Sequence, residues 1–277
     1  MPPGIGQAVQ RTRSKKMSQQ KNIAADNACK AARIRPNLFS FRPPDGGVVY
    51  LLDTSDGLAL VDTGFLRHRN SITRAMTSLD LDPRRISIGF VSHFHADHVG
   101  GMGWWRKRFG FPVAAHETAV QAMAKPDLIA TGAFMPYAGL NEQFAKCAVD
   151  ITLRGGETII RGGIRFRIIY APGHCVSSIH ILVSDMIFVG DTIFANGGIG
   201  WTDVHWGSNP EDYVETLDRL RKFIGCLALP AHGDPFVLSD RVISKAVKTA
   251  AFHIPFEHGM GCPRPPSRYR NRRRRIG

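Results

Sequence analysis

The stretch that decides the fold is ISIGFVSHFHADH, residues 86–98. Its first part, Ile86–Val91, is a short and almost continuous apolar run, which is typical of a buried strand. The run leads directly into four side chains that can bind metal: His93, His95, Asp97 and His98. Ordinary loop histidines do not explain this cluster well, because unpaired ionisable groups at a buried strand end are costly.

The spacing of these four side chains favours two neighbouring metal ions over one. On an extended segment His93 and His95 point to the same side, as side chains two apart do. A turn after them can bring Asp97 and His98 round to a second ion, and Gly100 and Gly101 permit a tight turn there. Imidazole and carboxylate ligands suit Zn2+ by default, and Mn2+ or Fe2+ are compatible with them.

Four further ionisable residues share one local setting, each just past a short apolar strand and beside Gly or Pro. They occur in LVDTG, APGHC, FVGDT and LPAHG, and they are Asp62, His174, Asp191 and His232. Each of them alone could simply cap a turn or a helix. Together with the histidine cluster, the four strand ends predict a common site at one edge of a sheet.

In this order the residues resemble the five motifs of the metallo-β-lactamase superfamily, over about residues 45–235. The resemblance implies an α+β fold, an αββα four-layer sandwich of two mixed β-sheets flanked by helices. It also implies a binuclear metal site at one edge, with these roles: one ion held by His93, His95 and His174, the other by Asp97, His98 and His232, Asp191 bridging them, and Asp62 orienting a histidine ligand.

Such a site predicts hydrolysis. Two divalent ions that share a water lower its pKa towards neutrality and polarise a substrate oxygen. We therefore expect a metal-bridging hydroxide to attack a small ester, thioester, lactone or amide, with Asp97 and Asp191 as the catalytic carboxylates. Asp191 is typical of the hydrolases of this superfamily and is usually missing from true β-lactamases, so β-lactam hydrolysis is expected only as a side activity.

The segment GDTIFANGGIGWTD, residues 190–203, is similar to the corresponding part of glyoxalase-II-like members. Trp201 replaces the basic residue expected there, and Ser178 stands where a histidine is often found. A glutathione carboxylate would have one partner fewer at such a site. This difference argues against glutathione thioesters as substrates.

Three alternative functions remain. A metal-dependent phosphodiesterase or nuclease on the same fold would give the arginine-rich C-terminus a role. A mononuclear iron sulfur dioxygenase is disfavoured by the complete two-metal ligand set, since Asp97 and His232 are both present. A non-catalytic binding module would have no need of that set.

The formal net charge of +13 is concentrated at the two ends of the chain. Residues 1–35 contain eight basic residues and one acid, and residues 263–277 contain seven arginines, which leaves 21 basic and 22 acidic residues between them. We therefore expect a flexible basic arm at 1–35, a single metallo-hydrolase domain at 36–258 and a disordered Arg-rich tail at 259–277. The tail predicts weak contact with nucleic acid or another anionic partner.

The five cysteines are scattered without a CxxC pair, which favours a reducing, cytoplasmic location over a disulfide framework. No apolar run approaches the roughly 20 residues that a membrane helix needs, and no apolar signal segment follows the basic start. A small molecule is the expected partner. The sequence leaves the substrate and the oligomeric state open.

The remaining pattern predicts two similar halves, each with strands followed by a helix, a strand and a helix. It includes a hairpin at Val48–Asp53 and Leu58–Asp62, and helices at 66–80, 210–223 and 239–252. Residues 125–147 are either a wall or lid of the pocket or a plain surface connection. Four aromatic residues either line that pocket or belong to the core: Trp104, Trp105, Phe134 and Trp206.

Overall fold

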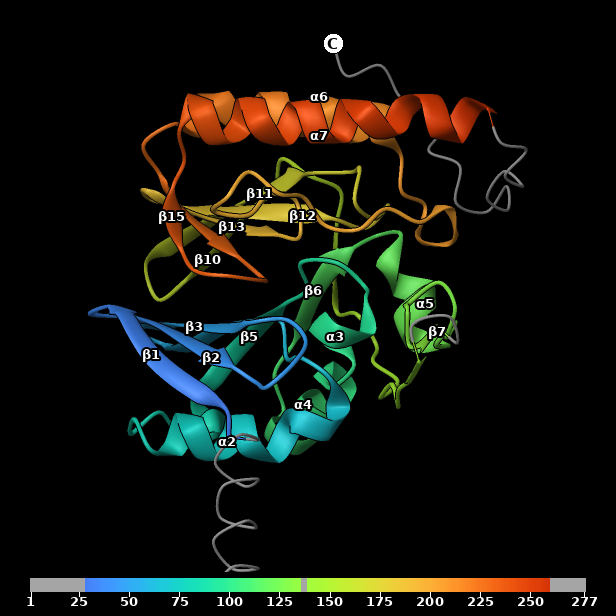
Figure 1. The fold of residues 1–277 in the computed structure, drawn as a ribbon. Helices are drawn as coiled ribbons and strands as arrows, with labels where there is room; N and C mark the ends of the chain where they lie inside the picture. The colour runs from blue at the N-terminus through green and yellow to red at the C-terminus, as the bar shows by residue number, and fades with distance from the viewer. Residues whose placement is uncertain (1–27, 136–138, 260–277) are drawn as a thin grey trace, which may run out of the picture.

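The computed structural model describes residues 28–135 and 139–259. Two β-sheets pack face to face, and helices cover the outer face of each sheet (Figure 1). Helices α6 (Pro210–Arg219) and α7 (Asp240–Gly259) cover one sheet, and α2 (Arg69–Thr77) and α4 (Met102–Phe109) cover the other. The predicted αββα sandwich is confirmed.

The first sheet has seven strands in the order β1-β2-β3-β4-β5-β6-β9, antiparallel from β1 to β4 and parallel from β4 to β9. The predicted hairpin is formed by β3 and β4. The predicted buried strand is β5, whose parallel neighbours lie on both sides. The strands are β1 (Lys30–Arg35), β2 (Leu38–Arg42), β3 (Val49–Thr54), β4 (Gly57–Val61), β5 (Ile86–Phe90), β6 (Val113–His116) and β9 (Ile151–Leu153).

Strand β1 corrects the predicted boundary of the N-terminal arm. Residues 30–35 were expected to be flexible, but they pair with β2 in antiparallel register, from Lys30 opposite Arg42 onward. The Arg35 guanidinium also donates two hydrogen bonds, of 2.7 and 2.8 Å, to the carboxylate of Asp185, which lies in a turn between two strands of the second sheet. The sequence pattern does not reveal this strand, because an exposed edge strand pairs with its neighbour through backbone hydrogen bonds and tolerates basic side chains. Residues 1–27 and 260–277 lie outside the described residues.

The second sheet has six strands in the order β10-β11-β12-β13-β14-β15. Its pairs are antiparallel except for β13 and β14, which run parallel. The strands are β10 (Thr158–Arg161), β11 (Ile164–Tyr170), β12 (Ile179–Val183), β13 (Met186–Gly190), β14 (Leu227–Pro230) and β15 (Phe236–Val237).

The remaining elements are short. The predicted helix at 66–80 is a 3-10 turn, η1 (Leu66–His68), followed by α2, and the predicted helix at 210–223 is α6 followed by η5 (Leu220–Phe223). Asn209 caps α6 by accepting a 2.8 Å hydrogen bond from the Asp212 backbone N–H. The others are η2 (Pro83–Arg85), α3 (Ala96–Val99), α5 (Ala119–Ala124), β7 (Phe134–Met135), β8 (Leu140–Asn141) and η4 (Val204–Trp206).

Three apolar layers hold the sandwich together. The middle layer joins the two sheets, where Phe90 of β5 stacks on Phe166 of β11 with ring centroids 5.0 Å apart. One outer layer packs α2 and α4 on the first sheet and includes Trp105. The other packs α6 and α7 on the second sheet and includes Tyr213. Burying apolar surface in all three layers fixes the strands against one another and therefore the positions of their ends.

The strand ends meet at one edge of the sandwich. The carboxyl ends of β4 and β5 are followed by Asp62 and His93, and those of β13 and β14 by Asp191 and His232. Each of these pairs of strands is parallel, so both ends of a pair point the same way. Among the described residues, no helix is long and apolar enough to cross a membrane.

Candidate metal centre

The segment after β5 is held in place by the turn after β4. The Thr63 and Gly64 backbone N–H groups donate to the His98 carbonyl oxygen at 2.7 and 2.8 Å, and the Asp62 N–H donates to the Phe90 carbonyl at 3.0 Å. Asp62 has a φ of 61°, in the left-handed region that few residues other than glycine adopt. The surrounding bonds compensate this strain and fix the Asp62 carboxylate beneath the histidines.

One group of three imidazoles lies at this edge. His174 Nε2 is 3.3 Å from His93 Nε2 and 3.1 Å from His95 Nδ1. All three residues are buried, and these nitrogen atoms all lie within 4.8 Å of one another. His93 and His95 come from the segment after β5, whereas His174 comes from the loop after β11, so the two halves of the molecule build the group together.

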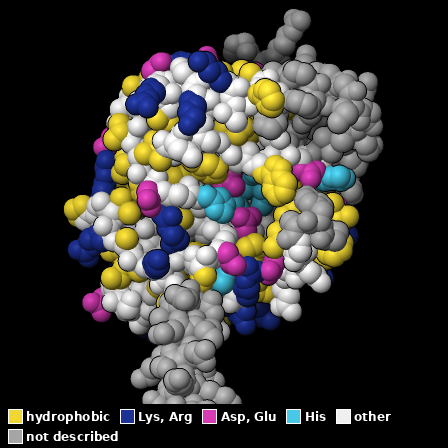
Figure 2. All heavy atoms as spheres, viewed as in Figure 1, with side chains coloured by type: hydrophobic (Ala, Val, Ile, Leu, Met, Phe, Trp, Pro, Cys, Tyr) yellow, Lys and Arg dark blue, Asp and Glu magenta, His cyan; other side chains and the backbone are white. Residues whose placement is uncertain are grey.

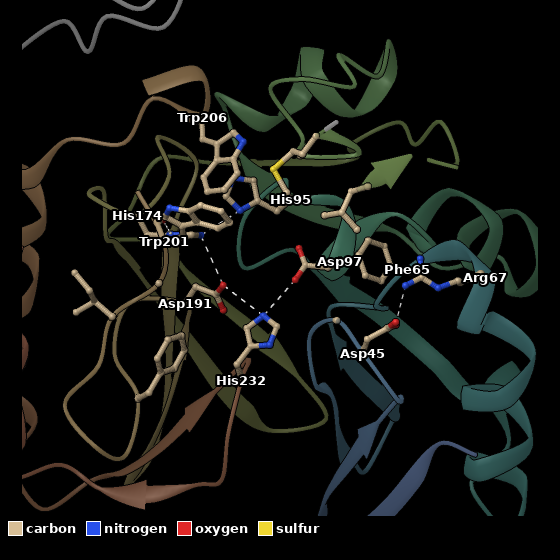
Figure 3. Close-up of a pocket in the computed structure, with 17 residues that line it drawn as sticks. Asp45, Phe65, Arg67, His95, Asp97, His174, Asp191, Trp201, Trp206 and His232 are labelled. Atoms are coloured by element: carbon tan, nitrogen blue, oxygen red, sulfur yellow. Dashed lines mark hydrogen bonds and ion pairs between the residues drawn. The ribbon is translucent and has the colours of Figure 1, made fainter. Parts of the chain in front are cut away.

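A second group combines Asp97, His98 and His232. Asp97 Oδ2 lies 3.2 Å from His98 Nε2 and 3.2 Å from His232 Nε2. His98 is fully buried, while the side chains of Asp97 and His232 are 28% and 38% exposed. This group therefore has an open side, which faces the pocket (Figure 3).

Asp191 lies between the two groups. Its Oδ2 atom is 3.7 Å from His174 Nε2, 3.4 Å from His98 Nε2 and 3.5 Å from His232 Nε2. Figure 3 shows its carboxylate pointing into the space between His174 and His232. All seven side chains predicted as ligands are thus brought together, from segments more than 100 residues apart.

Asp62 lies beside the histidines and outside the two groups. Its carboxylate accepts hydrogen bonds from the Ser92 N–H at 2.8 Å and from the Ser92 hydroxyl at 2.6 Å. The same hydroxyl lies 3.0 Å from His93 Nδ1, and Asp62 Oδ2 lies 3.4 Å from His98 Nδ1. Asp62 therefore contacts one histidine through Ser92 and a second one directly.

The sequence did not reveal how the second half orients its own residues. His174 Nδ1 lies 2.7 Å from the Trp201 carbonyl oxygen, which fixes the imidazole so that Nε2 faces the other histidines. The buried Tyr213 hydroxyl donates to the Asp191 carbonyl at 2.8 Å and accepts from the Gly200 N–H at 3.0 Å. Tyr213 lies on α6, and no motif in the sequence links it to the site.

The three-imidazole group is held neutral. Burial lowers the pKa of His93, His95 and His174. Nearby imidazoles lower the pKa of His93 and His95 further, whereas the Asp191 carboxylate partly offsets the effect of burial on His174. The pKa values of His93 and His95 fall well below the usual 6.5. Neutral imidazole is the form that binds a metal, because each ring then keeps a lone pair.

The second group is an ionic network. Burial is the largest single influence on Asp97 and Asp191 and raises the pKa of both, but the neighbouring His98 and His232 imidazoles together lower the pKa of both carboxyl groups below the usual value. Burial lowers the pKa of His98 and of His232, but the Asp97 and Asp191 carboxylates reverse this and raise both. A divalent cation held by these residues would take the place of the protons on the two imidazoles.

The donor set fits divalent metal ions. Three neutral imidazoles whose nitrogen atoms face one another cannot all be satisfied by mutual hydrogen bonds, because each nitrogen either donates or accepts. The buried Asp191 Oδ1 atom has no hydrogen-bond partner within the described part of the chain. Nitrogen and carboxylate donors converging in this way are the ligands that zinc prefers.

The site opens into a cavity of about 410 Å³. Figure 2 shows histidine and carboxylate side chains lying between the two halves on this face of the molecule. Of the described residues between 125 and 147, Gly132, Met135 and Leu140 line the cavity and so form part of its wall. Trp206 lines it as well, whereas Trp105 is fully buried in the core and Trp104 packs against that core. Phe134 is 40% exposed on β7, outside the cavity lining.

The family model of the metallo-beta-lactamase superfamily matches residues 42–229. The chain belongs to the metallo-β-lactamase superfamily. Among its relatives, the probable metallo-hydrolase YqgX of Bacillus subtilis is 28% identical over 212 residues, covering 76% of this chain and 92% of the relative. The human acyl-coenzyme A thioesterase MBLAC2 is 28% identical over 240 residues, covering 76% and 80%.

Solved structures share the superfamily fold. The metallo-beta-lactamase GOB-18 from Elizabethkingia meningoseptica superimposes with a TM-score of 0.68 at 16% identity, covering 83% of this chain and 94% of that one. BJP-1 of Bradyrhizobium japonicum gives 0.65 at 19% identity, covering 84% and 96%. At these identities the likeness concerns the fold. The family match and the hydrolase relatives identify the chain as a metal-dependent hydrolase of this superfamily.

Proposed function

We propose that the protein is a binuclear metal-dependent hydrolase that cleaves a small ester, thioester, lactone or amide. The observation that carries the proposal is the position of Asp191 Oδ2, within 3.4–3.7 Å of ligand nitrogens from both groups. A carboxylate oxygen placed in this way can bridge two ions. Zn2+ is the proposed metal, since one relative is named a probable zinc-dependent hydrolase, BaeB of Bacillus velezensis, 28% identical over 158 residues.

A thioester or ester is the first substrate class to test. Relatives named as thioesterases include MBLAC2 and the atrochrysone carboxyl ACP thioesterase of Aspergillus fumigatus, which is 28% identical over 192 residues. A hydroxyacylglutathione hydrolase of Idiomarina loihiensis is 23% identical over 184 residues. All three names describe hydrolysis at a thioester carbonyl or a related acyl group, so the proposal extends that chemistry to this chain.

The residues would divide the work as follows. Bound at the two groups, divalent ions would supply a water of lowered pKa and a Lewis acid for the substrate carbonyl. Asp191 lies between the two groups, so its carboxylate would contribute to both. Asp97, whose carboxylate is ionised and partly exposed to the cavity, is placed to accept a hydrogen bond from the attacking water. Asp62 and Ser92 keep His93 and His98 in position.

The functional hypothesis also includes a phosphodiesterase alternative and a cytoplasmic location. The phosphodiesterase alternative depends on the Arg-rich tail and on its predicted contact with an anionic partner. The Arg-rich residues of this tail, Arg264–Arg275, lie outside the described part of the chain. A cytoplasmic location is proposed because the four cysteines that the structure describes are all free: Cys29, Cys147, Cys175 and Cys226.

The test combines metal content with turnover in one preparation. Elemental analysis should give about two zinc ions per chain, and thioesters or lactones should be hydrolysed faster than nitrocefin or bis-p-nitrophenyl phosphate. Asp191→Ala serves as the matched inactive variant. Hydrolysis of the phosphodiester alone would favour the nuclease alternative. One iron per chain with no hydrolysis would replace the proposal with oxygen chemistry.

A further inference from the structure

An aromatic wall runs outward from the histidines. The Trp206 ring packs on His95, with centroids 4.4 Å apart, and lies 6.0 Å from His174. Trp201 continues the wall edge-to-face with Trp206, at 6.3 Å and 90°. Trp206 is buried, whereas Trp201 is 62% exposed at the mouth of the cavity. The wall therefore begins at the reacting centre and ends in solvent.

The rest of the cavity is also largely apolar. Phe194 and Ile199 also line the cavity from the second half, and three apolar residues line it from the first half: Phe65, Met135 and Leu140. Figure 3 shows Trp206 above His95 and His174, Trp201 beside His174, and Phe65 across the cavity from them. A cavity of about 410 Å³ falls within the range typical of small-molecule sites.

The Arg67 side chain in the cavity lining already has ionic partners. Arg67 is the only Lys or Arg among the described residues that line the cavity. Its guanidinium donates to Asp45 Oδ1 at 2.8 Å, forms an ion pair with Glu142 and lies 4.1 Å above the Phe65 ring. An anionic substrate group would have to displace one of these carboxylates. Away from the candidate metal centre, the described lining thus offers an anionic group only an arginine that is already paired, and offers an apolar group several aromatic and aliphatic side chains.

We propose that the site takes an apolar acyl group of several carbons, which lies along Trp206 and Trp201 with its carbonyl at the metal centre. The inference rests on the proposed function and narrows its substrate class. Three observations select this occupant: the wall is continuous with His95, its outer tryptophan is largely exposed, and the facing side chains are apolar. A hydrocarbon chain that covers the exposed indole makes a favourable contribution to the binding free energy, which a polar acyl group would not make.

Acyl chain length provides the test. N-acetylcysteamine thioesters with acetyl, butyryl, hexanoyl and octanoyl groups differ only in the acyl chain, and thiol release measures kcat/KM for each. Each added methylene should raise kcat/KM by about fourfold until the wall is covered. The ratio of octanoyl to acetyl kcat/KM should fall at least tenfold in Trp201→Ala, and Trp201→Phe should retain most of it.

Ile160→Ala is the matched control, because Ile160 is a half-exposed apolar residue on β10, outside the cavity lining. Its octanoyl-to-acetyl ratio should equal that of the wild type. Using a ratio within each variant removes any general loss of activity. A wild-type ratio near one would overturn the inference, even with rapid hydrolysis of every thioester.

A binding experiment separates this inference from the proposed function. Octanoate should quench the indole fluorescence of the zinc-loaded protein at far lower concentration than acetate, and Trp201→Ala should remove most of the difference. Tight octanoate binding without hydrolysis of any thioester would refute the proposed function and retain the apolar site. Equal binding of octanoate and acetate would refute the apolar site.

Discussion

The two halves of the molecule contribute to the candidate metal centre in different ways. The first half supplies His93, His95, Asp97 and His98 from one continuous segment after β5. The second half supplies His174, Asp191 and His232 singly, from three separate strand ends. The first half thus concentrates its contribution in one loop, while the second depends on the whole sheet. The comparison shows that a site can be half local motif and half tertiary assembly.

The largest expected effect comes from removing one ligand of each half. His95→Ala and Asp191→Ala should each lower kcat/KM by about a thousandfold or more, because each deletes a donor that converges on the centre. Circular dichroism should show both variants folded, and elemental analysis should show reduced zinc. Full turnover in either purified variant would contradict the ligand assignment for that half.

The next effect concerns how the first half orients its histidines. Asn tolerates the left-handed backbone of Asp62, so Asp62→Asn should fold while its amide replaces one carboxylate acceptor. Because Asp62 contacts Ser92 and His98, zinc affinity should fall about 10- to 100-fold. Competition with a chelator measures the affinity. Asp53→Asn, on the same sheet and away from the centre, should match the wild type.

In the second half, the residue that supports the ligands in a similar way is Tyr213. Tyr213→Phe keeps the buried ring but removes the hydroxyl that joins the Asp191 carbonyl to the Gly200 N–H. The free energy of unfolding should fall by about 1–2 kcal/mol, as for other buried hydrogen bonds. The visible spectrum of the cobalt-substituted protein should also change, since Asp191 and the Trp201 carbonyl both depend on this contact. An unchanged spectrum would leave Tyr213 with a purely structural role.

The smallest effect concerns a histidine that joins the halves away from the centre. His116 of β6 stacks on Tyr170 of β11, with centroids 4.3 Å apart and an interplanar angle of 5°. Burial lowers its pKa to about 4, so the folded protein resists protonation while the unfolded chain accepts a proton near pH 6.5. Stability is therefore lost as the pH falls from about 6.5 towards 4.

His116→Gln should remove this pH dependence. Between pH 7.5 and pH 6 the wild type should lose about 0.8 kcal/mol of unfolding free energy through His116, and the variant should lose that much less. Urea unfolding at both pH values measures the difference. His205→Gln alters an exposed histidine and is the control. Equal pH dependence in wild type and His116→Gln would show that His116 is not the group responsible.

The sequence alone determined the fold class, and it predicted the seven side chains that the structure brings together at the candidate metal centre. The buried run before His93 and the order of the ionisable residues at the other strand ends were sufficient for this. Ionisable side chains at the ends of buried strands are costly unless they are paired, so the strand ends that carry them are expected to meet. The same reasoning placed the N-terminal boundary wrongly. Strand β1 is recognisable only through its backbone pairing with β2 and the ion pair of Arg35 with Asp185.

Only the tertiary structure decided what surrounds the centre. The sequence pattern does not distinguish Trp206 from Trp105, yet Trp206 lines the cavity and Trp105 is buried in the core. Tyr213 and the Trp201 carbonyl reach the ligands through contacts that no spacing encodes. Metal ligands are specified by chemical type and can be read from a motif, whereas walls and supports are specified by packing between segments far apart in the chain.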